Sequence, residues 1–243
     1  MKPLYKRPES LRDVPTHYCS GCGHGIIHRI IAEVIDELGI REKTIGIAPV
    51  GCAVLAYDYF NFDVMEAPHG RPPAVATGIK RVLPDRIVFT YQGDGDLAAI
   101  GTGEIIHAGL RGEKLTVIFV NNSLYGMTGG QMAPTTLIGE KTATTPKGRC
   151  AEREGYPWNV VEVLKLFPGV TYVARGAVTQ PKNIRRVKVF IRKAFLNQVE
   201  NKGLSLVEVL SPCPVNLRME PFEAVRWVEE NLAEVFPLGE FKG

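Results

Sequence analysis

Short apolar runs alternate with longer amphipathic stretches along most of this chain. Runs such as Ile87 to Tyr91 and Leu115 to Val120 are apolar almost throughout, which is typical of strands covered on both faces. The alternation predicts an α/β fold, a doubly wound and mainly parallel sheet with helices on both faces. We expect strands at 44–48, 87–92, 115–120, 170–175 and 204–210, and helices at 25–38, 73–82, 97–110, 158–167, 181–201 and 221–233.

The length of the chain fits one α/β domain of ordinary size. Its 243 residues, 45% of them hydrophobic, are enough to fill a complete core. We expect residues 1–217 to form this domain and residues 218–243 to add a helix and tail that pack on it or on a partner subunit.

Charge and hydropathy argue against nucleic-acid and membrane partners. The net charge of +3 is small and spread along the chain, so no basic surface for nucleic acid is indicated. No stretch is long and apolar enough to span a bilayer. Residues 1–8 lack the apolar core of a signal peptide, and a cytoplasmic location is therefore expected.

Two polar motifs follow neighbouring apolar runs. Gly93-Asp94-Gly95-Asp96 follows one run and Asn121-Asn122 ends the next, with one helical stretch between them. A right-handed crossover would bring both motifs to the same edge of the sheet. A carboxylate and an amide oxygen suit Mg²⁺, and glycines let a diphosphate approach the backbone. Taken separately, each motif could instead be a solvent turn or a helix cap.

The cysteines suggest a second inorganic group. Cys19 and Cys22 share a glycine-rich loop, while Cys52 and Cys213 follow the expected strands at 44–48 and 204–210. Four thiolates suit either structural Zn²⁺ or an iron–sulfur cluster, and the spacing does not choose between them. Cysteines that are buried without a metal are a further alternative. Disulfides are not expected without an export signal.

Taken together, these motifs resemble those of thiamine-diphosphate enzymes, whose signature is Gly-Asp-Gly followed by Asn-Asn. Along nearly its whole length the chain is similar to the β subunits of 2-oxoacid:ferredoxin oxidoreductases, and most similar to the 2-oxoisovalerate and 2-oxoglutarate types. The matching motifs are Cys19-Ser20-Gly21-Cys22-Gly23-His24, Gly51-Cys52, His69-Gly70-Arg71, Gly93 to Asp96, Asn121-Asn122, Gly129-Gly130-Gln131 and Cys213-Pro214.

The resemblance assigns ligands for three cofactors: Mg²⁺, a 4Fe–4S cluster and thiamine diphosphate. It implies that Mg²⁺ is bound by Asp94, Asn122 and the carbonyl of Leu124. It implies that the cluster is bound by Cys19, Cys22, Cys52 and Cys213, which leaves Cys150 as a free thiol. The residues expected to contact thiamine diphosphate are Val50, Gly51, Cys52, Ala53, His69, Gly70, Arg71, Gly93, Gly95, Asp96, Gly126 and Met127.

The resemblance also implies a reaction and a set of partners. The reaction is the CoA-dependent oxidative decarboxylation of a 2-oxoacid to acyl-CoA and CO₂, with electrons passing through the cluster to ferredoxin. The glutamate that activates thiamine lies on a second domain in this family, for which this chain has no room. We therefore assign no catalytic residue here and expect that glutamate on an α subunit, so the chain alone should be inactive. Gamma and ferredoxin-like subunits are expected as well.

Met127 bears on the choice of substrate. Relatives specific for pyruvate have Asn at this position, so the apolar side chain favours 2-oxoisovalerate or, failing that, 2-oxoglutarate. We also expect His24 to form a hydrogen bond near the cofactor, and we expect His28 to be a packing or surface residue. The long polar segment 133–157 is expected to be functional or interfacial.

The sequence is also compatible with two other functions. One is a thiamine-dependent decarboxylase subunit without a cluster. The other is a non-catalytic binding module stabilised by zinc.

Overall fold

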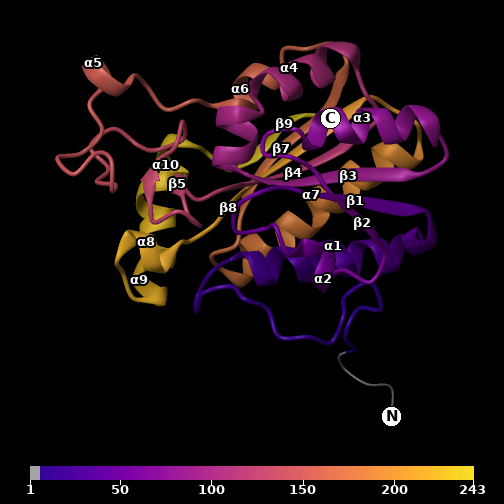
Figure 1. Cartoon of the computed structure of the whole chain (residues 1–243), viewed down its shortest axis with the longest axis horizontal. Coiled ribbons are helices and arrows are strands. Elements are labelled where there is room, and N and C mark those ends of the chain that lie inside the picture. The colour runs from indigo at the N-terminus through magenta and orange to yellow at the C-terminus, as the bar shows by residue number, and fades with distance from the viewer. Residues whose placement is uncertain (1–5) are drawn as a thin grey trace.

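The computed structural model describes residues 6–243, which form a domain built around a seven-stranded sheet (Figure 1). Residues 1–5, part of the segment considered above for an export signal, lie outside the described residues. The strand order is β2-β1-β3-β4-β8-β7-β9, and every pair is parallel except β7 with β9. The strands are β1 (Thr44–Ala48), β2 (Asp63–Glu66), β3 (Ile87–Gly93), β4 (Thr116–Asn121), β7 (Val170–Ala177), β8 (Leu204–Leu210) and β9 (Gly239–Lys242).

Helices cover both faces of the sheet (Figure 1). One face packs against α1, α2 and α7, and the other packs against α3, α4 and α6. The mainly parallel sheet with helices on both sides confirms the predicted fold class. The helices are α1 (His24–Leu38), α2 (Ala56–Tyr59), α3 (Pro72–Val82), α4 (Thr102–Arg111), α5 (Ala151–Glu154), α6 (Val160–Leu164), α7 (Pro181–Val199), α8 (Pro214–Leu217), α9 (Pro221–Trp227) and α10 (Ala233–Val235), with a 3₁₀ turn at Arg41–Lys43.

Helix α1 shows how the sequence specifies this packing. Ile27, Ile31 and Ile35 recur every four residues, and all three are fully buried in the core cluster shared with α7 and the sheet. The helix ends at Gly39, whose φ of 64° is the left-handed conformation of a C-cap. The i, i+4 apolar pattern and the terminal glycine together account for the position of this helix, which carries His24 at its first residue.

The expected strands lie close to their predicted bounds, but both edge strands were missed. β2 is mostly exposed and β9 is only partly buried, so neither carries the continuous apolar run that identified β3, β4 and β8. An edge strand is covered by a neighbour on one side only, and this weakens its sequence signal.

Three predicted helices are shorter or divided. The expected 97–110 helix is a π-helical turn at Gly95–Ile100 followed by α4. The chain packs tightly at the junction, where a Cβ on Gly101 would lie 2.6 Å from the Asp96 carbonyl oxygen. In place of the expected 158–167 helix, only the shorter α6 is helical. The expected 221–233 helix is divided into α9, a π-helical turn at Val228–Leu232 and α10.

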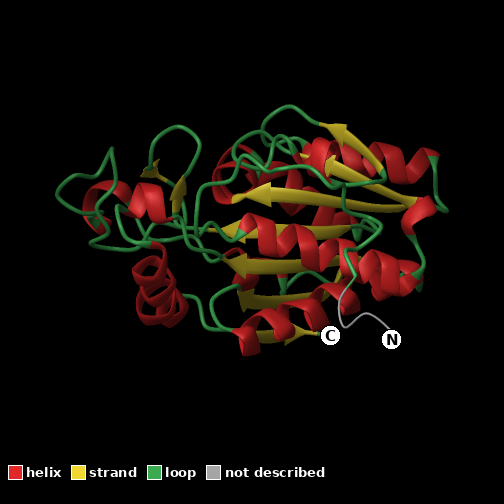
Figure 2. Ribbon diagram, turned by 90° about the horizontal axis from the view of Figure 1, so that it is seen from below, coloured by secondary structure: helices red, strands yellow, loops and turns green. Residues whose placement is uncertain are grey.

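A lobe of loops extends beyond the carboxyl ends of the strands (Figure 2). It contains the small hairpin β5 (Leu124–Tyr125) and β6 (Gln131–Met132), together with α5, α8 and α9. Val228, Leu232 and Phe236 pack against Leu137 and Leu210, so the C-terminal segment contacts both the lobe and the end of β8. The division at residue 217 stays a prediction. Within residues 6–243, no helix has the length and apolarity needed to cross a membrane.

Candidate functional site

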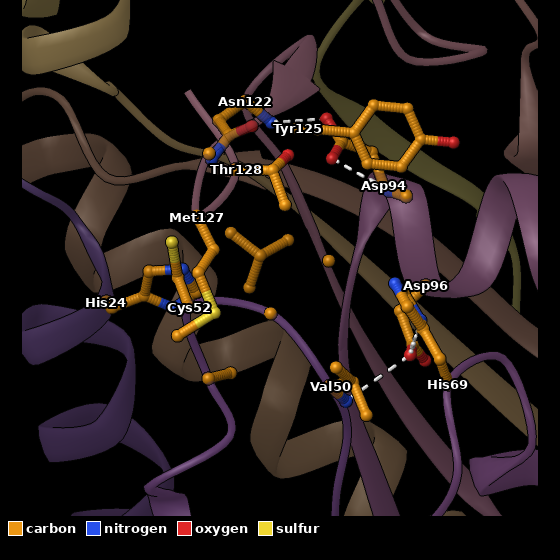
Figure 3. A pocket seen from close by; sticks show the side chains of 16 residues that line it. His24, Val50, Cys52, His69, Asp94, Asp96, Asn122, Tyr125, Met127 and Thr128 are labelled. Atoms are coloured by element: carbon orange, nitrogen blue, oxygen red, sulfur yellow. Dashed lines mark hydrogen bonds and ion pairs between the residues drawn. The ribbon is translucent and has the colours of Figure 1, made fainter. Parts of the chain in front are cut away.

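A pocket lies at the carboxyl ends of β1, β3 and β4 (Figure 3). Ligands collect at this edge of open α/β sheets because the connecting loops diverge there. Most of the predicted cofactor residues line the pocket, whereas Gly70 and Arg71 do not. The lining residues are His24, Val50, Gly51, Cys52, Ala53, His69, Gly93, Asp94, Gly95, Asp96, Val120, Asn122, Tyr125, Gly126, Met127 and Thr128.

The three predicted magnesium ligands lie close together: Asp94 and Asn122 line the pocket, and the Leu124 carbonyl lies beside Asn122. One terminal atom of the Asn122 carboxamide lies 3.2 Å from Asp94 Oδ2 and 2.7 Å from the Leu124 carbonyl oxygen. With the amide nitrogen at this position, it donates to both oxygens. With the amide reversed, its oxygen lies beside the two other oxygens at these distances. Neighbouring oxygens around octahedral Mg²⁺ lie roughly 2.9 Å apart, so the donor set and its spacing fit that ion.

The Asp94 carboxylate is buried, and its hydrogen-bond donors among the described residues are neutral groups. Oδ1 accepts from the Gly95 amide at 2.9 Å, and Oδ2 accepts from the Asn122 amide at 3.3 Å and from Thr135 Oγ1 at 3.1 Å. Burial raises the pKa of Asp94 to about 7, against the lowering effect of these donors. A divalent cation would supply the positive charge that this buried carboxylate needs, which supports the predicted role of the site.

Asp96, the second acid of the motif, organises the loop on the other side of the pocket. Its Oδ1 accepts from the Gly70 amide at 2.9 Å and lies 2.6 Å from His69 Nδ1, and its Oδ2 accepts from Gln92 Nε2 at 2.6 Å. The side chain is almost fully buried. Asp96 therefore fixes the orientation of His69, whose ring lines the pocket.

Gly70 and Arg71, unlike most of the residues predicted to contact the cofactor, do not line the pocket. Gly70 has a φ of 79°, and a Cβ there would meet Ile100 and the Gly101 backbone, so this glycine allows the loop to pack on the π-helical turn. Arg71 forms an ion pair with Glu104 at the start of α4. The sequence could not show this partner, because Glu104 is distant in the chain. A cofactor contact by either residue stays a prediction.

The four cysteines expected to hold the cluster come from three segments. Cys19 and Cys22 lie in the loop before α1, Cys52 follows β1, and Cys213 follows β8. Burial, together with the smaller effect of the negative charges of the other thiolates, raises the pKa of Cys22 to about 11 and that of Cys52 to about 12. These mutual effects place the four thiols in one neighbourhood, beside the pocket that Cys52 lines.

The number of these thiols bears on the kind of metal group they could hold. Within residues 6–243, no three His, Cys, Asp or Glu side chains are arranged closely enough to hold a single metal ion. A four-iron cluster takes one thiolate at each iron and so accommodates sulfurs that are farther apart. The donor set of four thiols therefore fits such a cluster. Cys150 lies elsewhere, at the start of α5, where its amide donates to Glu154.

Histidines and tyrosines pack together between the cysteine loop and the core. His24 Nδ1 lies 2.6 Å from the Tyr91 hydroxyl, and burial lowers the pKa of His24 to about 4, so its ring is neutral near pH 7. His28 is buried, stacks on Phe60 and lies 3.1 Å from the Tyr18 hydroxyl through Nε2. His24 lines the pocket, and His28 is a packing residue rather than a surface residue.

Several residues of the site were not singled out from the sequence. Val120, Tyr125 and Thr128 line the pocket beside predicted residues, and adjacency to the Asn-Asn motif was the signal that could have indicated them. Thr135 reaches Asp94 from a loop 41 residues along the chain. Its only sequence signal was its position in a long polar segment that follows the motif.

Comparisons with known proteins agree with this fold. Residues 49–209 match the family model for the thiamine pyrophosphate enzyme, C-terminal TPP binding domain. A ketoisovalerate oxidoreductase subunit VorA from Methanothermobacter thermautotrophicus is 49% identical over 251 residues, which cover 99% of this chain and 53% of that protein. A 2-oxoglutarate synthase subunit KorB from Archaeoglobus fulgidus is 39% identical over 227 residues, which cover 93% of this chain and 79% of that protein.

A solved structure shows the same architecture. It is a 2-oxoglutarate:ferredoxin oxidoreductase from Magnetococcus marinus with 2-oxoglutarate, coenzyme A and succinyl-CoA bound. It superposes with a TM-score of 0.79 at 29% identity, covering 93% of this chain and 73% of that one. The chain belongs to the thiamine pyrophosphate enzymes and, among them, to the family of 2-oxoacid oxidoreductase subunits. It spans about half the length of the VorA relatives.

Proposed function

We propose that this chain is the thiamine-diphosphate-binding subunit of a cytoplasmic 2-oxoacid:ferredoxin oxidoreductase that forms acyl-CoA and CO₂ from a 2-oxoacid and CoA. The observation that carries the proposal is that the Asn122 carboxamide lies beside both Asp94 and the Leu124 carbonyl, at a pocket lined by Asp94, Asn122 and Cys52. One side of the pocket fits a metal-bound diphosphate, and the thiols beside it fit an electron acceptor.

The residues of this chain bind and orient the cofactors. Asp94 and Asn122 would hold Mg²⁺, Gly93 leaves the backbone open to the diphosphate, and Gly95 makes room for the Tyr125 ring. When bound, thiamine diphosphate supplies a nucleophilic carbon for the 2-oxoacid carbonyl, and a 4Fe–4S cluster supplies a one-electron acceptor. Cys19, Cys22, Cys52 and Cys213 would hold that cluster close enough to the pocket for electrons to reach it.

Other lining residues shape the place where substrate would react. Met127 projects toward Cys52 and His24 in the pocket (Figure 3). It offers an apolar surface to the acyl chain, which favours a branched substrate such as 2-oxoisovalerate. His69, oriented by Asp96, offers a polar contact on the opposite side of the pocket (Figure 3).

The partner chain is needed to complete the site. No glutamate is among the described residues that line the pocket, and its two carboxylates, Asp94 and Asp96, already serve the diphosphate end and the His69 loop. We infer that the activating glutamate comes from an α subunit, with gamma and ferredoxin-like subunits and ferredoxin carrying electrons away. The chain purified alone should therefore be inactive.

Anaerobic co-purification with the products of neighbouring genes tests the proposal. The complex should contain thiamine diphosphate, Mg²⁺ and roughly four irons at this site. It should reduce a dye only when a 2-oxoacid and CoA are both present. Decarboxylation without iron or dye reduction would indicate the cluster-free decarboxylase. One zinc and no thiamine binding would indicate the zinc-stabilised module.

A further inference from the structure

Thr135 reaches the proposed magnesium site from a loop that belongs to none of the cofactor motifs. The side chain is fully buried, and its hydroxyl donates to Asp94 Oδ2 at 3.1 Å. The two other donors to this carboxylate are backbone amides, those of Gly95 and Asn122. Apart from the proposed ligand Asn122, whose carboxamide also faces Oδ2, Thr135 is therefore the one side chain among the described hydrogen-bond donors to Asp94.

This contact determines which carboxylate oxygen faces the other ligands. Oδ2 is the oxygen that lies 3.2 Å from the Asn122 carboxamide, whereas Oδ1 accepts from Gly95. A hydrogen bond to Oδ2 resists rotation of the carboxylate away from Asn122. Outer contacts of this kind orient metal ligands in many sites, and their loss costs about 10–100-fold in metal affinity or activity.

Arg149 sets the position of Thr135. Its guanidinium is buried, and one terminal nitrogen donates to the carbonyl oxygens of Pro134 at 2.9 Å and Thr136 at 2.5 Å, on both sides of Thr135. The remaining nitrogens donate to the carbonyls of Glu154, Gly155 and Tyr156. One rigid fork thus joins the Thr135 segment to the far end of the same loop.

The same loop also holds the backbone next to Asn122. Thr136 Oγ1 donates to the Ser123 carbonyl, and Ser123 Oγ donates to Glu140 Oε1 at 2.6 Å. Ser123 has a φ of 67°, which is strained for a residue other than glycine and needs such support. Residues 133–149 therefore contact the metal-binding motifs on both sides of the proposed site.

We propose that Thr135 is a positioning residue for the Asp94 carboxylate, and that Arg149 acts through Thr135 by fixing the carbonyls on either side of it. This inference rests on the proposed function, because it assigns the Asp94 site to Mg²⁺ and thiamine diphosphate. The ligand set itself is unchanged: Thr135 orients one ligand and does not bind the ion.

The test uses the anaerobically purified complex, freed of cofactor and titrated with Mg²⁺ at a fixed concentration of thiamine diphosphate. Thr135→Val keeps the shape and removes the hydroxyl, and it should weaken the apparent Mg²⁺ affinity about 10–100-fold. Thr135→Ser keeps the hydroxyl and should retain most of the wild-type Mg²⁺ affinity. The control is Thr44→Val, which removes another buried hydroxyl with a single carbonyl partner, at the opposite end of the sheet, and should bind like wild type.

Unchanged affinity in Thr135→Val, or equal loss in Thr135→Ser, would overturn the proposal. If wild type itself bound no Mg²⁺ and thiamine diphosphate, the proposed function would fail and this inference with it. The role of Arg149 is tested by Arg149→Lys, which keeps the charge and loses the fork. Adding Thr135→Val to Arg149→Lys should cause little further loss of Mg²⁺ affinity. Fully additive losses of affinity in the double variant would show that Arg149 does not act through Thr135.

Discussion

Asn121 Nδ2 donates a hydrogen bond of 2.7 Å to Glu208 Oε1, from the end of β4 to the neighbouring strand β8. The other Glu208 oxygen accepts from Arg175 Nε at 2.6 Å, and Asn121 Oδ1 accepts from the Ser123 amide at 3.0 Å. The two asparagines of the Asn-Asn motif therefore differ in role. Asn121 anchors the turn to the sheet, and Asn122 faces Asp94.

Glu208→Gln should destabilise the protein strongly. Arg175 is fully buried and would lose its ionic partner, and breaking a buried pair on one side costs about 3–5 kcal/mol. Chemical denaturation should show a fall of about 3 kcal/mol or more in the free energy of unfolding. Glu230→Gln, which breaks the exposed pair with Arg226, should cost no more than about 1 kcal/mol. Equal effects of the two substitutions would contradict this account of the buried pair.

Cys213→Ser should remove the cluster or make it labile, although Cys213 is remote in sequence from Cys19 and Cys22. The reason is that all four proposed ligands are needed to give each iron its thiolate. Cys150→Ser is the matched control, because Cys150 lies at α5 and is outside the proposed ligand set. Iron analysis after anaerobic purification measures both. A loss in the Cys150 variant alone, or equal losses in both, would show that the fourth ligand is wrongly assigned.

Met127 should favour acyl chains larger than acetyl. We expect the complex to turn over 2-oxoisovalerate, or failing that 2-oxoglutarate, with a higher kcat/KM than pyruvate. Met127→Asn should lower the ratio of kcat/KM for 2-oxoisovalerate to that for pyruvate by about 10-fold or more, since one methylene in an apolar pocket discriminates by about 1–3 kcal/mol.

Met65→Asn is the control for that substitution. Met65 is 51% exposed and Met127 53% exposed, but Met65 lies on the edge strand β2, away from the pocket. The ratio should not change in the Met65 variant. A wild-type preference for pyruvate would remove the argument from Met127 and leave the class of reaction untouched.

Because His28 is buried, it should make the protein less stable in mild acid than at neutral pH. Burial holds the pKa of His28 well below its usual range, whereas the unfolded chain has an ordinary value of about 6.5. Below about pH 6.5 the unfolded state takes up a proton that the folded state does not, so the free energy of unfolding falls as pH is lowered. Above that pH this group contributes no dependence.

Denaturation of wild type and His28→Phe at about pH 7.5 and about pH 5 measures this contribution. Phe preserves the stacking on Phe60 and cannot be protonated. The stability of wild type should fall more between the two pH values than that of the variant. Identical falls would mean that His28 takes up a proton equally well in both states.

The sequence was sufficient for the fold class and for the motifs that lie at the ends of buried strands. Asp94 and Asn122 are recognisable because each follows a continuous apolar run, and parallel strands bring such ends together. β2 and β9 were missed because an edge strand needs no continuous apolar run. The division of the helix after Asp94 depends on how closely Gly70 approaches Gly101, which is a tertiary contact.

The residues that hold the proposed ligands in place could not be predicted from the sequence either, because they too depend on tertiary contacts. Thr135 and Glu208 act through partners that are distant in the chain, and Arg149 joins two parts of one irregular loop. No local pattern distinguishes these three from other polar residues. Arg71 shows the same limit. Its motif could not indicate that the side chain pairs with Glu104 on a neighbouring helix, and its cofactor contact stays a prediction. Local patterns identify the proposed ligands, and long-range packing determines what holds them in place.

The most direct test of the central claim is whether substrate itself reduces the cluster. The anaerobic complex, loaded with Mg²⁺ and thiamine diphosphate, is mixed with 2-oxoisovalerate and CoA while its visible iron–sulfur absorption is followed. The account predicts that this absorption bleaches in wild type and that Asp94→Ala, with its iron content intact, does not bleach until dithionite is added. Bleaching by substrate in Asp94→Ala, or none in wild type with full cofactor content, would contradict it.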